Sequence, residues 1–252
     1  SITTGDYNVG IGDNALTANT TGGNNTAVGT FALDVNTTAS YGTGIGYAAL
    51  SSNTTGANNT ATGYYALYAN TTGDNNVAIG KGSLDACTTS TNNVAVGNDA
   101  GGGVTTGNGE NVFVGNRAGV GVTTGQQNII LGDNACANGT MTGNLNVIIG
   151  DNAGLVNTTG ANNVGVGGAA LGANTTGAEN VAVGTYALDA NTTPSNMTAL
   201  GYAALSSNTT GTSNVAVGSH SLAATTTGGS NTAVGKEAGQ SNTTGGDNTA
   251  IG

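Results

Sequence analysis

The stretch Asn59-Thr-Ala-Thr-Gly63-Tyr-Tyr-Ala-Leu-Tyr-Ala-Asn70-Thr-Thr-Gly73-Asp-Asn75 contains one unit of a repeat that accounts for the whole chain. Gly63 has equivalents at intervals of 17 residues, or of 18 residues in two of the 14 intervals. A fixed short period indicates supersecondary units that are stable only when they stack on their neighbours. The sequence therefore predicts a single repeat array over residues 1–252. We call the equivalent residues the marker glycines: Gly12, Gly29, Gly46, Gly63, Gly80, Gly97, Gly115, Gly132, Gly150, Gly167, Gly184, Gly201, Gly218, Gly235 and Gly252.

The three residues before each marker glycine predict a short strand. The first is Val, Ile or Thr in every unit, and the third is Ile, Val or Leu in every unit except that of Thr62. β-Branched residues favour strands, and the first and third side chains of an extended triplet share one face. The middle residue is mostly Ala or Gly and becomes Phe113, Ile130 and Ile148 in the central repeats. Since both faces are apolar, we expect the strand to be buried on both.

The residues after each marker glycine complete the unit. Ala or Ser follows at the third position and usually Leu at the fourth, where Gly101, Gly119 and Gly154 replace it in the middle of the chain. An Asn-Thr-Thr-Gly turn comes next in most units. Gly and Asn tolerate positive φ and close tight turns. The unit is thus predicted to be a strand, a glycine bend, a second short strand and an Asn/Gly turn, without helix.

Seventeen residues suit one coil of a parallel β-solenoid or flattened β-roll. About 15 coils at about 4.8 Å each would make a rod of about 70 Å. Asn stands four residues before 13 of the 15 marker glycines, and stacked Asn side chains would satisfy the buried backbone groups of the turns from coil to coil. The two longer intervals, around residues 107–110 and 138–143, predict outward bulges of a turn. The chain opens within a repeat and stops on a marker glycine, so we expect it to be a segment of a longer protein.

Composition argues against several classes of function. The chain has three Lys and Arg against 13 Asp and Glu, and a net charge of −10. Nucleic-acid binding and binding to an anionic membrane surface both depend on cations, and only Lys81, Arg117 and Lys236 supply them. No apolar run approaches the ~18 residues of a transmembrane helix. The strict phase of the apolar positions favours a folded core over disorder.

The sequence predicts no catalytic, cofactor-binding or metal-binding residues, and we expect a protein that is not an enzyme. His220 is the only histidine and is expected to be exposed. The acidic residues fall in different phases of the repeat, such as Asp34, Asp85 and Asp189 in one phase, whereas calcium-binding β-rolls need aspartates in every turn.

The two cysteines, Cys87 and Cys136, occupy different phases of the repeat and lie three coils apart. Three coils correspond to about 14 Å along a solenoid axis, beyond the roughly 7 Å Cα limit of a disulfide. We therefore predict no intrachain disulfide and interpret both residues as small packed side chains.

The recurring Asn-Thr-Thr triplet has two interpretations. It matches the N-glycosylation signal, with further triplets at Asn24, Asn58, Asn138 and Asn196. We favour a structural Asn/Thr turn ladder instead. Ice binding through the Thr columns is disfavoured, because adjacent threonines in an extended segment point to opposite faces. The Asn-Thr-Thr triplets begin at Asn19, Asn36, Asn53, Asn70, Asn157, Asn174, Asn191, Asn208 and Asn242.

The string Asn-Val-Ala-Val-Gly-x-x-Ala, at residues 93–100 and 180–187, resembles the head repeats of trimeric autotransporter adhesins of the YadA type. Similar Asn-Thr-Ala-x-Gly-x-x-Ala-Leu runs occur in phage tail-fibre-like proteins. The resemblance implies a left-handed parallel β-roll, a homotrimer around one axis, and a role in adhesion or in a fibre. It also implies that one strand face fills the roll while the small Ala face packs at the threefold axis. The repeat is longer than in the adhesin heads, and the chain shows no coiled-coil heptads.

We therefore expect a non-enzymatic extracellular structural fibre segment or surface adhesin, located at a cell surface or on a virion fibre. Its partners would be copies of itself, as a homotrimer or an end-to-end filament, and host or cell-surface glycans. The alternative is a ligand-binding solenoid for carbohydrate or ice. The aromatic side chains near the marker glycines would then face a sugar: Phe31, Tyr47, Tyr64, Tyr65, Tyr186 and Tyr202.

Overall fold

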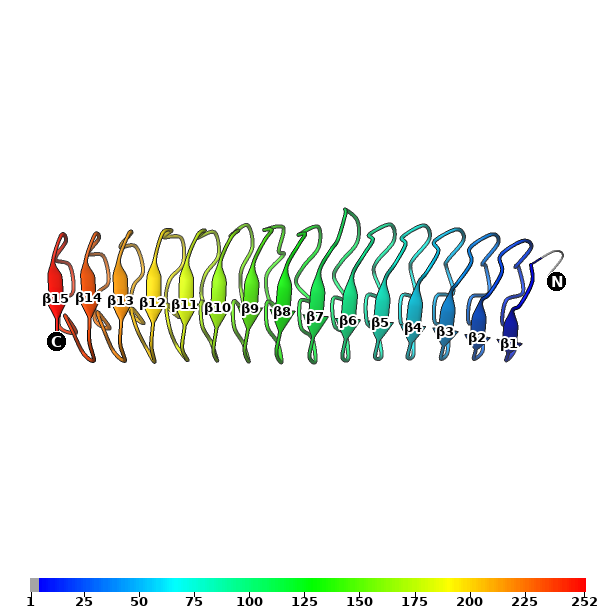
Figure 1. Cartoon of the computed structure of the whole chain (residues 1–252), viewed down its shortest axis with the longest axis horizontal. Helices are drawn as coiled ribbons and strands as arrows, with labels where there is room; N and C mark the ends of the chain where they lie inside the picture. The colour runs from blue at the N-terminus through cyan, green and yellow to red at the C-terminus, as the bar shows by residue number, and fades with distance from the viewer. Residues whose placement is uncertain (1–4) are drawn as a thin grey trace. The chain divides into compact units, whose positions relative to one another are not determined.

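The computed structural model describes residues 5–252, which form fifteen strands of three residues each and no helix (Figure 1). Within each of the two units of the chain, neighbouring strands pair in parallel, with a register that advances by one repeat per strand, as in Thr60↔Val77. The chain divides into two compact units, Ser1–Gln126 and Gln127–Gly252. The predicted all-β parallel solenoid with a repeat of about 17 residues is therefore confirmed.

In the described part of unit 1, the strands follow each other in sequence order and neighbours pair along the sheet. Each lies immediately before a marker glycine, where the sequence predicted it. They are β1 (Val9–Ile11), β2 (Thr26–Val28), β3 (Thr43–Ile45), β4 (Thr60–Thr62), β5 (Val77–Ile79), β6 (Val94–Val96) and β7 (Val112–Val114).

Unit 2 repeats the arrangement with the remaining strands. They are β8 (Ile129–Leu131), β9 (Val147–Ile149), β10 (Val164–Val166), β11 (Val181–Val183), β12 (Thr198–Leu200), β13 (Val215–Val217), β14 (Thr232–Val234) and β15 (Thr249–Ile251).

The orientation of the strands implied by the adhesin resemblance, with the small Ala face outside the roll, is wrong. The middle residue points into the coil and is fully buried in most strands, as in Ala61, Ala78 and Phe113, whereas the first and third residues point outward. The Ala face fills the coil, and the Val, Ile and Thr face is the outer one. Space is the reason, because a Cβ built on Gly44 of β3 already lies 3.4 Å from the Leu33 side chain. The interior next to the strand has room for little more than a methyl group.

The leucine that stands four residues after most marker glycines fills the rest of the interior. Leu33, Leu50, Leu67 and Leu84 are fully buried. The segment around them is a turn, and the predicted second strand is absent from residues 5–252. Its backbone explains this: Tyr65 and Leu67, for example, have φ of 58° and 49°. Left-handed residues at alternate positions are incompatible with an extended strand.

The central coils redistribute the core volume between two positions. Phe113 of β7 is large, and the leucine position holds Gly101 in the coil before it and Gly119 in its own coil. A Cβ added to Gly101 would lie 2.6 Å from the Phe113 ring, and one added to Gly119 would clash with the same ring. One phenylalanine on the strand thus occupies the space that two leucines fill elsewhere.

Within each unit, a marker glycine stacks on the marker glycine of the next coil. Gly46 has φ of 130°, and a Cβ built on it would lie 2.5 Å from the Gly63 carbonyl oxygen. Both the backbone conformation and the close approach exclude a side chain, which explains why this position repeats without exception.

Two ladders of buried asparagines confirm the predicted coil-to-coil Asn stacking. In the Asn-Thr-Thr turns, the Asn36 amide donates to Asn19 Oδ1 at 2.8 Å and to the Ala39 carbonyl at 3.1 Å. Four residues before the marker glycine, the backbone N–H of Asn76 donates to Asn59 Oδ1 at 2.8 Å. Each side chain therefore satisfies turn groups of its own coil and bonds to a neighbouring coil.

The extra residue of the 18-residue coil in unit 1 lies where the sequence predicted a bulge. The register Val94↔Val112 skips one residue, and Figure 1 shows the turn between β6 and β7 projecting beyond its neighbours. Gly107, with φ of 103°, and Gly109, with φ of 67°, provide the backbone freedom for this wider turn.

Candidate functional site

Aromatic side chains gather after consecutive marker glycines of unit 1. Tyr47 and Tyr64, which directly follow Gly46 and Gly63, stack with ring centroids 5.4 Å apart and an interplanar angle of 14°. Tyr65 contacts Tyr64 edge to face at 4.3 Å, and Tyr68 contacts Tyr65 at 4.7 Å. Phe31 lies 5.9 Å from Tyr47, with the rings at 89°. Tyr47, Tyr64 and Tyr68 are each more than 40% exposed, so the cluster is open to solvent.

The tyrosine hydroxyls of this cluster interact with one another. A hydrogen bond to Tyr64 is the largest cause that raises the pKa of Tyr65, and a hydrogen bond to Tyr47 opposes it. The cluster therefore combines exposed aromatic rings with the hydroxyl groups of its tyrosines. Such an arrangement suits a ligand that offers both apolar and hydrogen-bonding edges.

A second, smaller aromatic cluster lies in unit 2. Tyr186 and Tyr202 are 6.0 Å apart at 84°, and the His220 ring lies 5.3 Å from Tyr202 at 61°. His220 was expected to be exposed, but it is half-buried, and its Nδ1 lies 3.1 Å from the Ser219 hydroxyl. The contact with Tyr202 accounts for the difference. The six aromatic residues singled out from the sequence thus belong to two clusters, which also include Tyr68 and His220.

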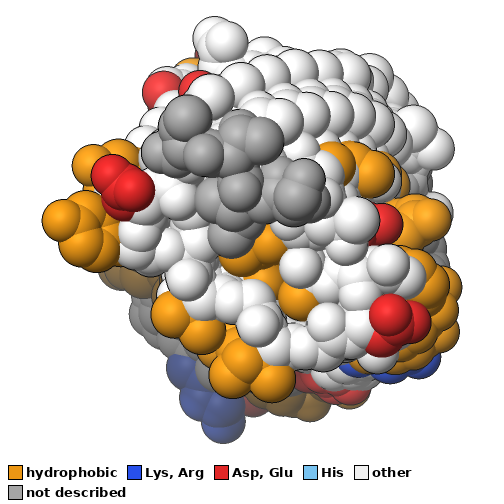
Figure 2. All heavy atoms as spheres, turned by 90° about the vertical axis from the view of Figure 1, so that its right-hand side faces the viewer, with side chains coloured by type: hydrophobic (Ala, Val, Ile, Leu, Met, Phe, Trp, Pro, Cys, Tyr) orange, Lys and Arg blue, Asp and Glu red, His pale blue; other side chains and the backbone are white. Residues whose placement is uncertain are grey.

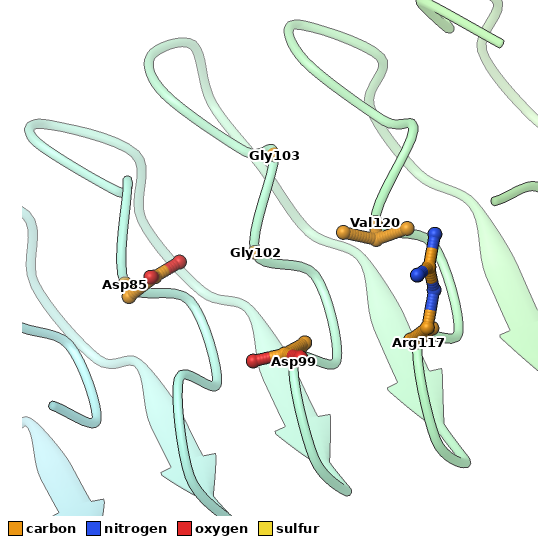
Figure 3. A pocket seen from close by; sticks show the side chains of 6 residues that line it. All are labelled: Asp85, Asp99, Gly102, Gly103, Arg117 and Val120. Atoms are coloured by element: carbon orange, nitrogen blue, oxygen red, sulfur yellow. The ribbon is translucent and has the colours of Figure 1, made fainter. Parts of the chain in front are cut away.

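A shallow hollow of about 260 Å³ opens on unit 1 (Figure 3). Its lining includes the carboxyl groups of Asp85 and Asp99, the guanidinium of Arg117, and Val120. Burial, followed by the charge of Asp99, raises the pKa of Asp85. The hollow is smaller than the pockets that usually enclose small ligands. Among residues 5–252, no group of three or more His, Cys, Asp or Glu side chains is placed to hold a metal ion.

Two other aspartates, at the same position of the repeat as Asp85, also have a raised pKa. Burial raises the pKa of Asp34 and of Asp189, and backbone hydrogen bonds oppose the shift in each case. In both residues one carboxyl oxygen is buried without a hydrogen-bond partner. Since these carboxyl groups belong to separate coils, they do not converge on a common point with a nucleophile or base.

The two cysteines are free and buried. Burial raises the pKa of Cys87 to about 11 and that of Cys136 to about 12, so both thiols stay protonated at neutral pH. Cys136 occupies a leucine position, and Cys87 occupies an Asn-ladder position, where its Sγ lies 3.6 Å from the Ser90 carbonyl. Both act as small packed side chains, in agreement with the interpretation of the sequence.

The asparagines of the Asn-Thr-Thr triplets serve the turn ladder. The Asn53 amide, for example, is fully buried and donates to Asn36 Oδ1 at 3.2 Å and to the Gly56 carbonyl at 2.9 Å. A glycan on this nitrogen would break both bonds. The additional acceptor triplets differ, because Asn24, Asn58, Asn138 and Asn196 are exposed.

The two threonines of each triplet also differ from each other. The first is bound to the neighbouring coil, as in Thr54, whose hydroxyl donates to the Thr71 carbonyl at 2.9 Å. The second, such as Thr55 or Thr72, is exposed. The turn therefore presents one exposed Thr column and not the paired columns of a flat lattice.

The outer strip is a mainly apolar surface that recurs from coil to coil in each unit and is interrupted by threonines. We define it as the first and third side chains of the strands, which point outward. Away from the chain ends of unit 1, Ile45, Ile79, Val94 and Val114 are 36–41% exposed. Ile129, Val183, Leu200 and Val234 continue the pattern in unit 2. Figure 2, which faces the N-terminal end, shows hydrophobic side chains exposed on the flank of the chain.

No family model matches the chain, and neither a curated protein nor a solved structure matches it. Within residues 5–252 there is likewise no helix of the length and hydrophobicity that would cross a membrane.

Proposed function

We propose that the chain is a structural segment of an extracellular fibre or surface adhesin, which acts by self-association and by presenting its turns, and not by catalysis. The observation that carries the proposal is the outer strip. It places Val, Ile, Leu or Thr at the same two outward positions of coil after coil, with apolar members such as Ile79 and Val114 exposed, and exposed apolar surface of this kind usually marks an interaction site.

A second copy of the chain suits this strip. A repeat array offers the same strand face at a constant spacing, so two such faces match along their length and not at one point only. The strip is also free of Lys, Arg, Asp and Glu, which removes the cost of burying charge in the interface. The adhesin-like repeat string argues in the same direction. The strip supports lateral association, such as a homotrimer. The end-to-end filament, the other form that we propose, would pair terminal strands and would not depend on the strip.

The solution mass tests self-association. We expect light scattering to give three times the 24.0 kDa of one chain for a trimer, or a larger mass that grows with concentration for a filament. A stable mass of one chain would refute the proposal.

Matched lysine variants locate the interface. Replacing Ile79 and Val94 on the outer strip with Lys places charge at the contact, and we expect the mass to fall to that of one chain. Replacing Thr72 and Thr89, which are exposed on the turns of neighbouring coils, adds the same charge outside the strip. We expect this control to keep the mass of the unmodified protein. An equal effect of the two pairs would mean that the strip is not the interface.

Carbohydrate binding is the second candidate function, and the exposed aromatic clusters favour it. Binding to ice is less well supported, because the first threonine of each Asn-Thr-Thr turn uses its hydroxyl for the neighbouring coil.

A further inference from the structure

We propose that each unit carries one carbohydrate-binding platform, and that the two platforms are built from three aromatic rings in the same arrangement. The first consists of Phe31, Tyr47 and Tyr65, and the second of Tyr186, Tyr202 and His220. The inference deepens the proposed surface role by naming its ligand class and the residues that bind it.

The three rings of each platform match in position and geometry. Unit 1 adds Tyr64, which stacks on Tyr47 and is replaced by Ser219 in unit 2. In both, a ring two residues after a marker glycine contacts a tyrosine one residue after the next marker glycine: Phe31–Tyr47 at 5.9 Å and 89°, and Tyr186–Tyr202 at 6.0 Å and 84°. The same tyrosine contacts a ring from the following coil. That contact is Tyr47–Tyr65 at 5.7 Å and 75° in unit 1, and Tyr202–His220 at 5.3 Å and 61° in unit 2.

The residue that follows Tyr47 or Tyr202, the tyrosine at the centre of each platform, has a small side chain. It is Ala48 in unit 1 and Ala203 in unit 2, and both are buried. Ala169 occupies the same position in a coil without such rings and is half-buried. A small side chain therefore stands in the same position as the flanking rings, in the coil between them. A bulky residue at this position would separate them.

The surface chemistry of the platforms indicates a carbohydrate. Tyr47 and Tyr202 are 42% and 49% exposed, so both side chains reach solvent. A pyranose has apolar C–H groups on one face, which pack on the electron-rich face of an aromatic ring, and hydroxyl groups around its edge, which bond to tyrosine hydroxyls. The net charge of −10 disfavours acidic polysaccharides, so the expected ligand is a neutral glycan.

A second copy of the chain is a less suitable occupant of the platforms. The outer strip already offers an apolar surface to self-association, whereas the platforms belong to the turn after each marker glycine and carry hydroxyl groups. A protein that binds the platforms would be detected as a change in mass without retention by glycans.

Affinity electrophoresis in native gels tests the proposal. The gels would contain a β-1,4-glucan, a β-1,3-glucan, a mannan or a galactan. We expect at least one of these to retard the unmodified protein. Because the chain has no Trp, tyrosine fluorescence reports binding of the corresponding soluble oligosaccharide directly. The absence of retardation by all four polysaccharides would overturn the proposal.

The repeat supplies variants that preserve the fold. Thr30 and Thr185 occupy the position of Tyr47 and Tyr202 in other coils, so Tyr47→Thr and Tyr202→Thr are compatible with the turn. We expect each single variant to bind more weakly and the double variant to lose at least tenfold in affinity. Tyr41→Asn is the control, because Tyr41 is exposed outside the clusters and Asn is the usual residue at its position.

Retardation of the double variant equal to that of the unmodified protein would also overturn the proposal. The solution mass distinguishes this failure from failure of the fibre role. If the chain self-associates but does not bind glycans, the fibre role stands and the platform proposal fails. If the chain stays single but binds glycans, the platform proposal stands and the fibre role fails.

Discussion

The coil of Leu67 and the coil of Phe113 lie in the same unit and fill the same interior in opposite ways. In the Leu67 coil the strand contributes Ala61 and the turn contributes Leu67, and both are fully buried. In the Phe113 coil the strand contributes the large side chain and the turn contributes Gly119. The backbone path is shared, since Leu67 and Gly119 have φ of 49° and 66°.

The difference shows that the fold conserves core volume and not residue identity at either position. Native cores tolerate such exchanges when the total volume is kept. The two solutions differ in backbone strain, because a left-handed conformation is unfavourable for Leu and free for Gly. The Phe113 coil places its bulk on the strand, where φ is negative, and leaves the left-handed position to glycine.

Removing Phe113 tests this exchange and gives the largest expected effect. Phe113→Ala would leave the space between Gly101 and Gly119 empty, and we expect it to cost about 3–5 kcal/mol in the free energy of unfolding. Urea unfolding followed by circular dichroism measures it. Adding Gly101→Leu and Gly119→Leu to Phe113→Ala restores the arrangement of the Leu67 coil, and we expect most of the stability to return.

When Phe113 is present, a leucine at either position is expected to lower the stability of the chain. Gly119→Leu alone would clash with the ring and cost about 1–3 kcal/mol or more. The exchange of volume would be contradicted if the triple variant were no more stable than Phe113→Ala alone.

The Asn ladder offers a second comparison within unit 1. Between Asn19 and Asn70 the ladder is continuous, and Asn53 Oδ1 accepts from the Asn70 amide at 2.8 Å. The next position is Cys87, and Asn70 Oδ1 is buried without a partner. Asn208 in unit 2 has the same defect, because Thr225 follows it in the ladder. The ladder therefore ends where the next coil lacks an amide.

Extending the Asn ladder is expected to raise the stability of the chain, by less than removing Phe113 lowers it. Cys87→Asn would supply a donor to Asn70 Oδ1, and we expect a gain of about 0.5–1.5 kcal/mol, the usual net contribution of one hydrogen bond. Cys87→Ala, which removes the thiol without adding a donor, is the control. Thermal unfolding compares the two. A Cys87→Asn variant less stable than Cys87→Ala would show that the position has no room for the amide.

The period of the marker glycines predicted the parallel solenoid, the place of every strand and the two Asn ladders. These features depend on which residues recur in the same phase, and phase is visible in one sequence. The alternation within a triplet such as Val77-Ala78-Ile79 defined two faces, but the larger, β-branched face was assigned to the wrong environment. That choice depends on what lies across the coil. In β3, for example, Leu33 lies against Gly44, and this leucine belongs to another part of the unit.

The turn with positive φ after the marker glycines was not predicted from the sequence, for a related reason. Tyr65 and Leu67 have no local preference for positive φ, and tertiary packing imposes it on them. Gly101, Gly119 and Gly154 at the leucine position were the available signal. The aromatic residues were recognised, but their grouping into two matching platforms required the coil geometry. A sign of this match in the sequence is that the stretches from Tyr47 to Gly56 and from Tyr202 to Gly211 are identical.

Replacing the aspartates of the turns is expected to change stability least. Asp34 and Asp85 occupy the same position of the repeat in different surroundings. Asp34 lies among regular Leu coils, and only burial raises its pKa, whereas Asp85 also has the charge of Asp99 nearby. A carboxyl group whose pKa is raised above the ordinary 3.8 holds its proton longer in the folded chain than in the unfolded chain. The folded state therefore binds more protons in this window, and stability falls as pH rises through it.

At neutral pH the destabilisation is complete, and below the ordinary pKa it disappears. We therefore expect Asp85→Asn to stabilise the chain at pH 7, Asp34→Asn to do so less, and neither to differ from the unmodified protein at pH 3. Melting temperatures across this range measure the effect, with Asp247→Asn at an exposed turn as the control. A loss of stability at pH 7 on replacing Asp85 would show that its carboxylate has a stabilising partner, with Arg117 across the hollow as the first candidate.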